Sequence, residues 1–162
     1  MDTHDFIARF GGVYEHSPWV AEQVATLATD VDDAATLAAL MADCVDNASV
    51  EQQLELICAH PDLAGKAQVA GELTPESTVE QAGAGLDRCS VGEFARFQQL
   101  NAAYWEKFGF PFVMAVRGQD RASILHAFAS RLDNDYDLEF ETALMEIHKI
   151  ARLRLDAMRK DA

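Results

Sequence analysis

Apolar residues recur at intervals of three and four along most of this chain, and the segments with this spacing begin with residues typical of helix starts. A period near 3.6 places apolar side chains on one face of a helix, whereas a half-buried strand requires strict alternation. Only nine glycines and four prolines interrupt the 162 residues. The sequence therefore predicts an all-α protein.

The start and stop signals predict about eight helices. Capping boxes at Ser49-x-x-Gln52 and Ser90-x-x-Glu93 mark two of the starts. We expect Ser17 and Thr74 to cap two further helices, because each precedes a proline suited to the first helical position. The predicted helices cover about residues 3–10, 18–27, 34–45, 50 to 59 or 60, 75 to 83 or 85, 91–104, 121–128 and 136–158.

One apolar segment breaks the helical period. Phe108-Gly109-Phe110-Pro111-Phe112-Val113 is expected to be extended as far as Val116. It is either plain core or the wall of a ligand site, since Gly109 would allow close approach of the backbone and non-helical N–H and C=O groups can bind a ligand. Eight helices and one short extended segment leave no room for a large sheet, so we expect a single-domain helical bundle over residues 1–162.

Charge limits the classes of partner. Asp and Glu number 27 against 13 Lys and Arg, which gives a formal net charge of −14. So acidic a surface disfavours nucleic acid and anionic membranes, which both attract clustered cations. The chain has no apolar run near the roughly 20 residues of a spanning helix. With neither a secretory signal at the N-terminus nor a peroxisomal tripeptide at the C-terminus, we expect a cytoplasmic protein.

The sequence offers no pattern typical of a metal or cofactor site. Cys44, Cys58 and Cys89 form no CxxC pair, and no histidines stand at ligand spacing, so the cysteines are interpreted as small buried hydrophobes. Gly83-Ala84-Gly85 follows a predicted helix and is interpreted as its C-terminal stop, not as a phosphate-binding loop. We expect no metal, nucleotide or flavin.

Two features are candidates for chemistry. His60-Pro61 stands at a helix exit, where a histidine that titrates near neutral pH can project from a rigid corner, although a structural or exposed histidine fits equally well. Ser77 and Glu80 stand three apart and share a helix face. They form either another capping box or, if Thr74 is the cap, a polar pair one turn inside the helix, near N–H groups that attract an anion.

The last predicted helix combines an apolar stripe with cations. The stripe comprises Leu138, Ala143, Leu144, Ile147, Ile150, Leu153 and Met158, and the cations are Lys149, Arg152, Arg154, Arg159 and Lys160. Cations near a helix C-terminus are favoured by the macrodipole, which is one interpretation of the cluster. In the other, an arginine turned inward binds a carboxylate substrate through a bidentate pair.

These motifs occur together in one known family. The chain resembles 2-oxo-4-hydroxy-4-carboxy-5-ureidoimidazoline (OHCU) decarboxylases, the last enzymes on the route from urate to (S)-allantoin. The resemblance covers nearly the whole chain and rests on these stretches: Phe10 to Trp19, His60-Pro61-Asp62-Leu63-Ala64-Gly65, Ser77-x-x-Glu80-Gln81-x-Gly83-Ala84-Gly85-Leu86, Leu100-Asn101-x-x-Tyr104 with Lys107 to Phe112, Arg131-Leu132-x-Asn134, and Glu146 to Leu155.

The resemblance implies an all-helical homodimer that decarboxylates OHCU without a cofactor. It makes His60 and Glu80 the catalytic pair, and Ser77, Gln81 and Arg154 side-chain contacts to the substrate. By the same resemblance, Pro61, Phe110 and Val113 line the pocket, the last two partly through backbone groups. Two alternatives stay open: a decarboxylase of a related ureido or imidazole acid, and a helical binding module without catalytic activity.

Overall fold

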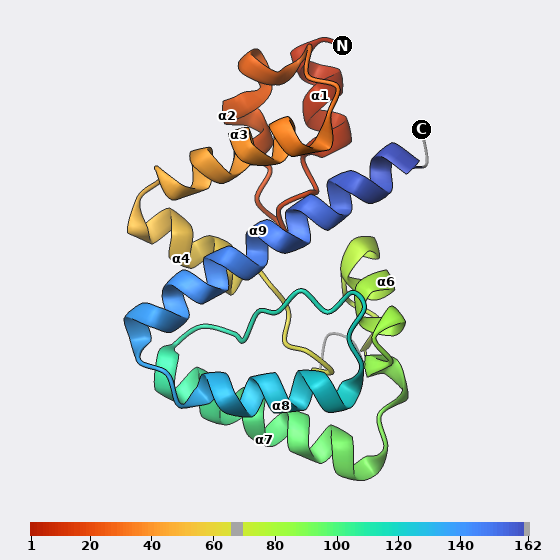
Figure 1. The fold of residues 1–162 in the computed structure, drawn as a ribbon, viewed down its shortest axis with the longest axis vertical. Helices are drawn as coiled ribbons and strands as arrows, with labels where there is room; N and C mark the ends of the chain where they lie inside the picture. Colours follow the sequence, from red (N-terminus) through yellow and green to blue (C-terminus); the bar gives the residue numbers. More distant parts are fainter. Residues whose placement is uncertain (66–69, 161–162) are drawn as a thin grey trace. The chain divides into compact units, whose positions relative to one another are not determined.

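The structure is a computed structural model that describes residues 1–65 and 70–160, with side chains as far as Met158. Over these residues it is helical and contains no strand, which confirms the predicted all-α fold (Figure 1). The predicted irregular stretch at 61–73 falls partly outside the described residues. The helices are α1 (Thr3–Phe10), α2 (Trp19–Ala28), α3 (Ala34–Asp46), α4 (Val50–Cys58), α6 (Pro75–Gly83), the 3-10 helix η1 (Leu86–Arg88), α7 (Val91–Phe108), α8 (Arg121–Leu132) and α9 (Tyr136–Lys160).

Most helices begin at the capping residue that the sequence predicts. Both boxes are formed, with Ser49 and Ser90 each accepting a hydrogen bond from the backbone N–H three residues later. The prediction for Ser17 is wrong. Its hydroxyl donates to the carbonyl of Glu15 at 2.9 Å, and α2 begins after Pro18 without a side-chain cap. A serine before proline therefore did not identify the cap, because a nearby turn carbonyl competes for the same hydroxyl.

The chain divides into two compact units, Met1–Ala59 with Ile147–Ala162 and, between them in sequence, His60–Glu146. The boundary falls within α9. In the first unit α2 packs against both α1 and α3. The buried side chains of this unit include Phe6, Val24, Met41, Leu56 and Leu155. That residues 1–162 form one domain stays a prediction.

In the second unit an aromatic core holds the extended segment 109–116. Helices α7 and α8 lie side by side, joined by this segment (Figure 1). Phe112 stacks on Phe128 with ring centroids 3.9 Å apart, and the Tyr104 ring meets Phe108, Phe110 and Phe112 edge-on or tilted. The segment therefore stays extended because its large side chains fill the space between helices.

A buried ion pair accompanies this aromatic core. Arg131 Nε lies 2.9 Å from Oε1 of Glu139, whose side chain is fully buried and also accepts a hydrogen bond from the Tyr104 hydroxyl. The guanidinium of Arg131 lies over the Phe112 ring and donates to the carbonyl of Val113 at 2.7 Å. Burial raises the pKa of Tyr104, so its phenol remains protonated and able to donate. One charge pair thus joins three helices to the extended segment.

Several predicted burials are wrong. Leu138 is exposed, and Leu153 and Met158 are only half-buried, while Leu155 and Glu139 fill buried positions on α9. None of the three cysteines is fully buried: Cys58 is exposed and the other two are intermediate. The predicted stripe of α9 is correct in the middle of the helix, where Ala143, Leu144, Ile147 and Ile150 are buried, and it is wrong near the two ends.

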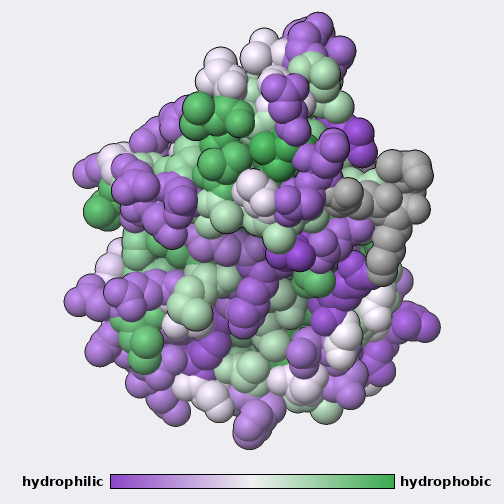
Figure 2. Space-filling model, turned by 45° about the horizontal axis from the view of Figure 1, so that its top comes forward, coloured by the Kyte–Doolittle hydropathy of each residue, from purple (hydrophilic) through white to green (hydrophobic). Residues whose placement is uncertain are grey.

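The face of the molecule drawn in Figure 2 is mainly hydrophilic. Figure 2 shows hydrophilic side chains with smaller groups of hydrophobic ones between them. The exposed large apolar residues, such as Val79 and Val91, come from several different helices. Among the described residues, no helix has the length and apolar character needed to cross a bilayer.

Replacing each of two glycines at the ends of α7 by alanine should change the free energy of unfolding in opposite directions. Gly109 ends the helix in the left-handed region with φ of +72°, and a Cβ there would touch no other protein atom, so its role in the ligand-free fold is conformational. Gly109→Ala should destabilise the protein by about 1 kcal/mol. Gly92→Ala, in the first turn and with open space around its Cβ, should stabilise it by about 0.5 kcal/mol. Urea unfolding measures both, and two changes of the same sign would contradict this account.

Candidate functional site

His60 begins an irregular turn that follows α4. Ala59 caps the end of α4, and Pro61 prevents residue 60 from continuing the helix, as the sequence predicts. The His60 side chain is buried to 7% exposure, so it is not the exposed histidine that one interpretation allowed. Ala64 adopts a positive φ of 50°, which is unusual for a residue with a Cβ. The chain therefore turns sharply just after His60.

Side chains from two helices hold the backbone of this turn. From α6, Gln81 accepts a hydrogen bond from Ala64 N–H at 3.1 Å and donates to the carbonyl of Asp62 at 3.2 Å. From α7, Gln98 donates to the carbonyl of Ala64 at 2.8 Å and Asn101 to that of Leu63 at 3.0 Å. Four polar backbone groups of the turn thus have side-chain partners, among them the carbonyls of buried Leu63 and Ala64.

A third contact from α7 reaches the side chain of the same turn. The indole N–H of Trp105 donates to Oδ1 of Asp62 at 2.9 Å. Trp105 itself is partly exposed, so this bond closes the outer side of the turn.

Helix α6 presents the other predicted catalytic group. The side chain of Thr74 accepts a hydrogen bond from Ser77 N–H, so Thr74 is the cap and the Ser77–Glu80 capping box is excluded. Ser77 and Gln81 are buried on one face of α6, and Glu80 on the same face is half-buried. A serine hydroxyl, a carboxylate and an amide therefore line one side of a short helix.

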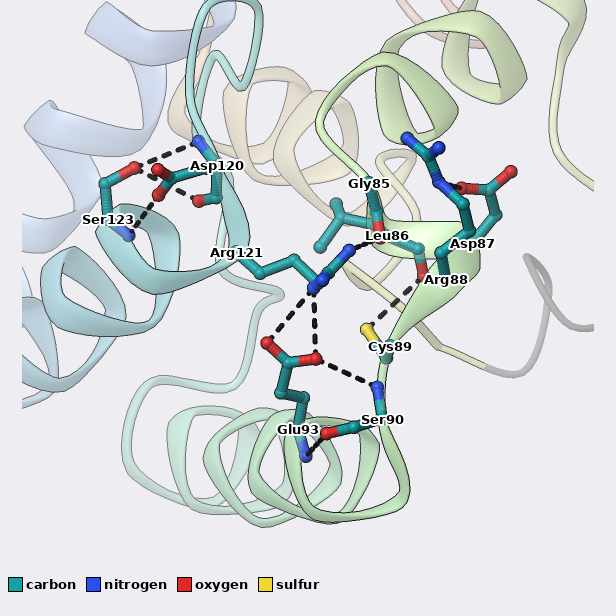
Figure 3. Close-up of polar contacts among 10 residues, drawn as sticks. All are labelled: Gly85, Leu86, Asp87, Arg88, Cys89, Ser90, Glu93, Asp120, Arg121 and Ser123. Atoms are coloured by element: carbon teal, nitrogen blue, oxygen red, sulfur yellow. Dashed lines mark hydrogen bonds and ion pairs between the residues drawn. The ribbon is translucent and has the colours of Figure 1, made fainter.

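The C-terminal end of α6 is fixed by a charged clasp, defined here as Gly85, Glu93 and Arg121 (Figure 3). Arg121 donates to the carbonyl of Gly85 at 2.9 Å, and its Nε lies 3.0 Å from the Glu93 carboxylate. Glu93 in turn accepts from the N–H of Ser90, and these bonds lower the pKa of the Glu93 carboxyl. Gly85 has φ of +79°, and a Cβ there would meet Arg121 at 2.8 Å.

The clasp explains why a glycine follows α6. It confirms that Gly83-Ala84-Gly85 is a helix stop, as the sequence predicts. It also joins the end of α6 to the starts of α7 and α8, so the helix that carries Glu80 is held at that end by charge as well as by packing.

The extended segment supplies Phe110 and Val113. The Phe110 ring is fully buried within the aromatic core, so plain core is the correct interpretation for this side chain in the ligand-free protein. The carbonyl of Val113 is bonded to Arg131, and the N–H of Ala115 donates to Glu146 at 3.3 Å. The contacts of Phe110 and Val113 with substrate stay predictions.

Arg154 belongs to the first unit and has partners there. It is 6% exposed, its Nη2 lies 3.2 Å from the Glu15 carboxylate, and its Nη1 donates to the carbonyl of Val13 at 3.2 Å. The interpretation of Arg154 as a solvated cation at a helix end is therefore wrong. Because a buried guanidinium and carboxylate depend on each other, Arg154 also contributes to the stability of the first unit.

All predicted site residues except Arg154 belong to the second unit. Within it, Gln81 links the turn after His60 directly to α6. Sequence reasoning missed the roles of Gln98 and Asn101 on α7 and of Glu15 beside Arg154. One signal was available: Asn101 occupies a core position of α7, between buried Phe97 and Tyr104, where an apolar residue would be expected.

The described residues contain no group of three or more His, Cys, Asp or Glu side chains arranged to hold a metal ion. Desolvation raises the pKa of the Cys44 and Cys89 thiols, which favours their unreactive protonated form.

A family model, related sequences and solved structures all identify the same protein family. Residues 1–156 match the model of a family described as OHCU decarboxylase. The 2-oxo-4-hydroxy-4-carboxy-5-ureidoimidazoline decarboxylase of Haloferax volcanii is 45% identical over 96% of this chain and 89% of its own length.

Two solved structures are also similar. A crystal structure of (S)-allantoin synthase is 34% identical with a TM-score of 0.77, over 97% of this chain, which spans 50% of that one. A crystal structure of OHCU decarboxylase in the presence of (S)-allantoin is 25% identical with a TM-score of 0.65, over 85% of this chain and 91% of that one. The chain therefore belongs to the OHCU decarboxylase family.

Proposed function

We propose that this protein is a carbon–carbon lyase that converts OHCU into (S)-allantoin and CO2, the final step of urate oxidation. The family match over residues 1–156 carries this proposal. The named relative and the solved structure with (S)-allantoin support the substrate and the product. The imidazole of His60 and the half-buried carboxylate of Glu80 are the proposed acid–base groups.

The substrate provides its own electron sink. OHCU carries a carboxylate and a hydroxyl on one ring carbon, next to a C=N bond. When the bond to the carboxylate breaks and CO2 leaves, the electron pair moves into the adjacent C=N. The nitrogen of that bond takes up a proton. The hydroxyl carbon then becomes a carbonyl as its proton departs, and the ureido-bearing carbon takes up a second proton on one face. The chemistry thus asks for orientation and proton transfer, and it needs neither pyridoxal phosphate nor thiamine.

His60 and Glu80 are the proposed proton-handling groups. A neutral imidazole can accept the hydroxyl proton, and the buried position of His60 directly before Pro61 restricts the orientation of its ring. Glu80 is proposed to orient His60 and to disfavour the substrate carboxylate in the ground state by like charge. Ser77 and Gln81 are proposed to hydrogen-bond the ligand, with Pro61, Phe110 and Val113 as its apolar walls.

Arg154 is proposed to bind oxygens of the anionic substrate. A protein with net charge −14 needs a locally positive group to attract an anion, and a guanidinium matches a carboxylate in two parallel hydrogen bonds. Glu15 and the Val13 carbonyl hold this guanidinium in a fixed orientation in the first unit.

We further propose that the protein is a cytoplasmic homodimer whose partner is a small molecule and not a nucleic acid or a membrane. The acidic composition supports the exclusion of polyanions. The family resemblance supports the dimer, and sedimentation equilibrium of the purified chain measures it directly.

The function is tested with OHCU generated freshly from urate in buffer containing EDTA. OHCU decays spontaneously to racemic allantoin, so circular dichroism separates catalysis from decay. Rapid appearance of the (S)-enantiomer supports the proposal. Racemic product at the uncatalysed rate would contradict it and favour a binding module, and turnover only of a related ureido acid would favour the other alternative.

His60→Ala should lower kcat by about 10²- to 10⁴-fold, because a general acid–base group contributes that much. His126→Ala is the matched control, since His126 is exposed on α8. Thermal unfolding of both variants verifies that they fold. Near-normal turnover of His60→Ala would make His60 a structural residue.

Glu80→Gln separates catalysis from helix stability. Thr74 caps α6, so the substitution should change the free energy of unfolding by less than about 0.5 kcal/mol, and turnover should still fall by more than about tenfold. Glu76→Gln, exposed on the same helix, should leave turnover unchanged. Equal activity of the two variants would remove Glu80 from the mechanism.

Arg154 is expected to affect both stability and substrate binding. Arg154→Met removes the guanidinium that pairs with the buried Glu15 carboxylate, which should cost about 3–5 kcal/mol in urea unfolding. Arg152→Met, whose pair with Asp156 is exposed, should cost less than about 1 kcal/mol. Arg154→Lys keeps the charge but loses the planar fork, so it should raise KM more than it lowers kcat. Wild-type KM in Arg154→Lys would exclude Arg154 as a ligand.

A further inference from the structure

We propose that Asn101 and Gln98 are positioning residues of the reaction, acting through the backbone of the turn that carries His60. The inference rests on the proposed function, in which His60 exchanges protons with the substrate. Both residues lie on α7, they belong to the second unit together with His60, and neither is needed for direct contact with substrate.

Their hydrogen bonds are consecutive along the turn. Asn101 donates to the carbonyl of Leu63 at 3.0 Å, and Gln98 donates to the carbonyl of Ala64 at 2.8 Å. Residues 98 and 101 stand three apart and so share a helix face. The two donors therefore fix two successive peptide groups at the point where Ala64 adopts its positive φ.

The burial of Asn101 points to a positioning role. Asn101 is 5% exposed, and its buried acceptor Oδ1 has no hydrogen-bond partner among the described residues. A buried amide with one unsatisfied oxygen is poor for stability, and an apolar side chain between Phe97 and Tyr104 would pack there without that penalty. The asparagine is explained by the one bond that it makes, to the carbonyl of Leu63.

The same turn is bonded to α6 through Gln81, which lies next to Glu80 in the sequence. Asn101 and Gln98 thus set the turn against α7, while Gln81 sets it against α6. Pro61 stiffens the short connection back to His60 because its φ is fixed. A shift of the turn would therefore move the His60 imidazole relative to the helix that carries Glu80.

Four single variants test this proposal: Asn101→Ala, Gln98→Ala and two controls. Gln53→Ala removes another buried glutamine that donates to a carbonyl, that of Val45 at 2.9 Å, but in the first unit. Gln99→Ala removes an exposed glutamine next to Gln98. The measurements are kcat and KM for OHCU, thermal unfolding, amide hydrogen exchange of Ala64, and the NMR signal of the His60 ring across pH.

Asn101→Ala and Gln98→Ala should lower kcat by about 10- to 100-fold with KM changed less than about threefold, because a small misplacement of a catalytic group costs this much. Exchange of the Ala64 amide should accelerate and the His60 signal should shift. Gln53→Ala should lose comparable thermal stability without these effects. If Asn101→Ala does not fold, the kcat of Gln98→Ala tests the proposal, because Gln98 is only half-buried and its replacement is less disruptive.

Equal kcat losses in Gln53→Ala, or an unmoved His60 signal in both α7 variants, would overturn the proposal. Failure of the wild type to convert OHCU would instead overturn the proposed function. The exchange and NMR measurements need no substrate, so they distinguish the two failures.

Discussion

Wherever a helical protein leaves the helix, its backbone N–H and C=O groups must find partners outside the regular pattern. This requirement governs the two irregular stretches of the second unit. In the turn at 61–65, amide side chains of α6 and α7 bond one N–H and three carbonyls. In the extended segment at 109–116, Arg131 bonds the carbonyl of Val113 and Glu146 bonds the N–H of Ala115. Both stretches contain predicted site residues, so the polar side chains that complete the backbone also determine where those residues lie.

Buried charge is the second feature on which the fold depends. Glu139 and Arg154 are both on α9, and each is nearly or fully buried in an ion pair. Each pair also involves backbone carbonyls, of Val113 in one case and Val13 in the other. Such pairs are weak sources of net stability, but removing one partner is costly. Their main effect is therefore to fix the position of irregular backbone, and their net contribution to the free energy of unfolding is smaller.

The sequence was sufficient for local structure and much less so for buried polar contacts. Thr74, Ser90 and Asp120 mark helix starts because a cap is decided within four residues. Leu138 was predicted to lie on the buried stripe of α9 and Glu139 was not considered, because a pattern of apolar residues gives no reason to bury a carboxylate. The sequence left two interpretations of Arg154 open, a cation at a helix end and an arginine turned inward. Its partner Glu15 lies 139 residues away in the sequence. No local pattern encodes such a pair.

The predicted site shows the same limit. His60 and Ser77–Glu80 stood out because a proline and two competing caps made them locally unusual. Asn101 and Gln98 did not, because their role depends on a turn more than 30 residues earlier in the sequence. Their importance is visible only when the hydrogen bonds of the turn are counted one by one. Family resemblance supplied the roles of the site residues, and these roles await measurement.

The central claim is that His60 and Glu80 act as one catalytic unit on OHCU. A double-variant cycle with His60→Ala and Glu80→Gln tests it most directly, using the rate of (S)-allantoin formation above spontaneous decay. Groups that work in the same step are strongly non-additive, so the double variant should be about as slow as the slower single variant. Rate losses that multiply in the double variant would show that the two residues act independently, and would contradict this account.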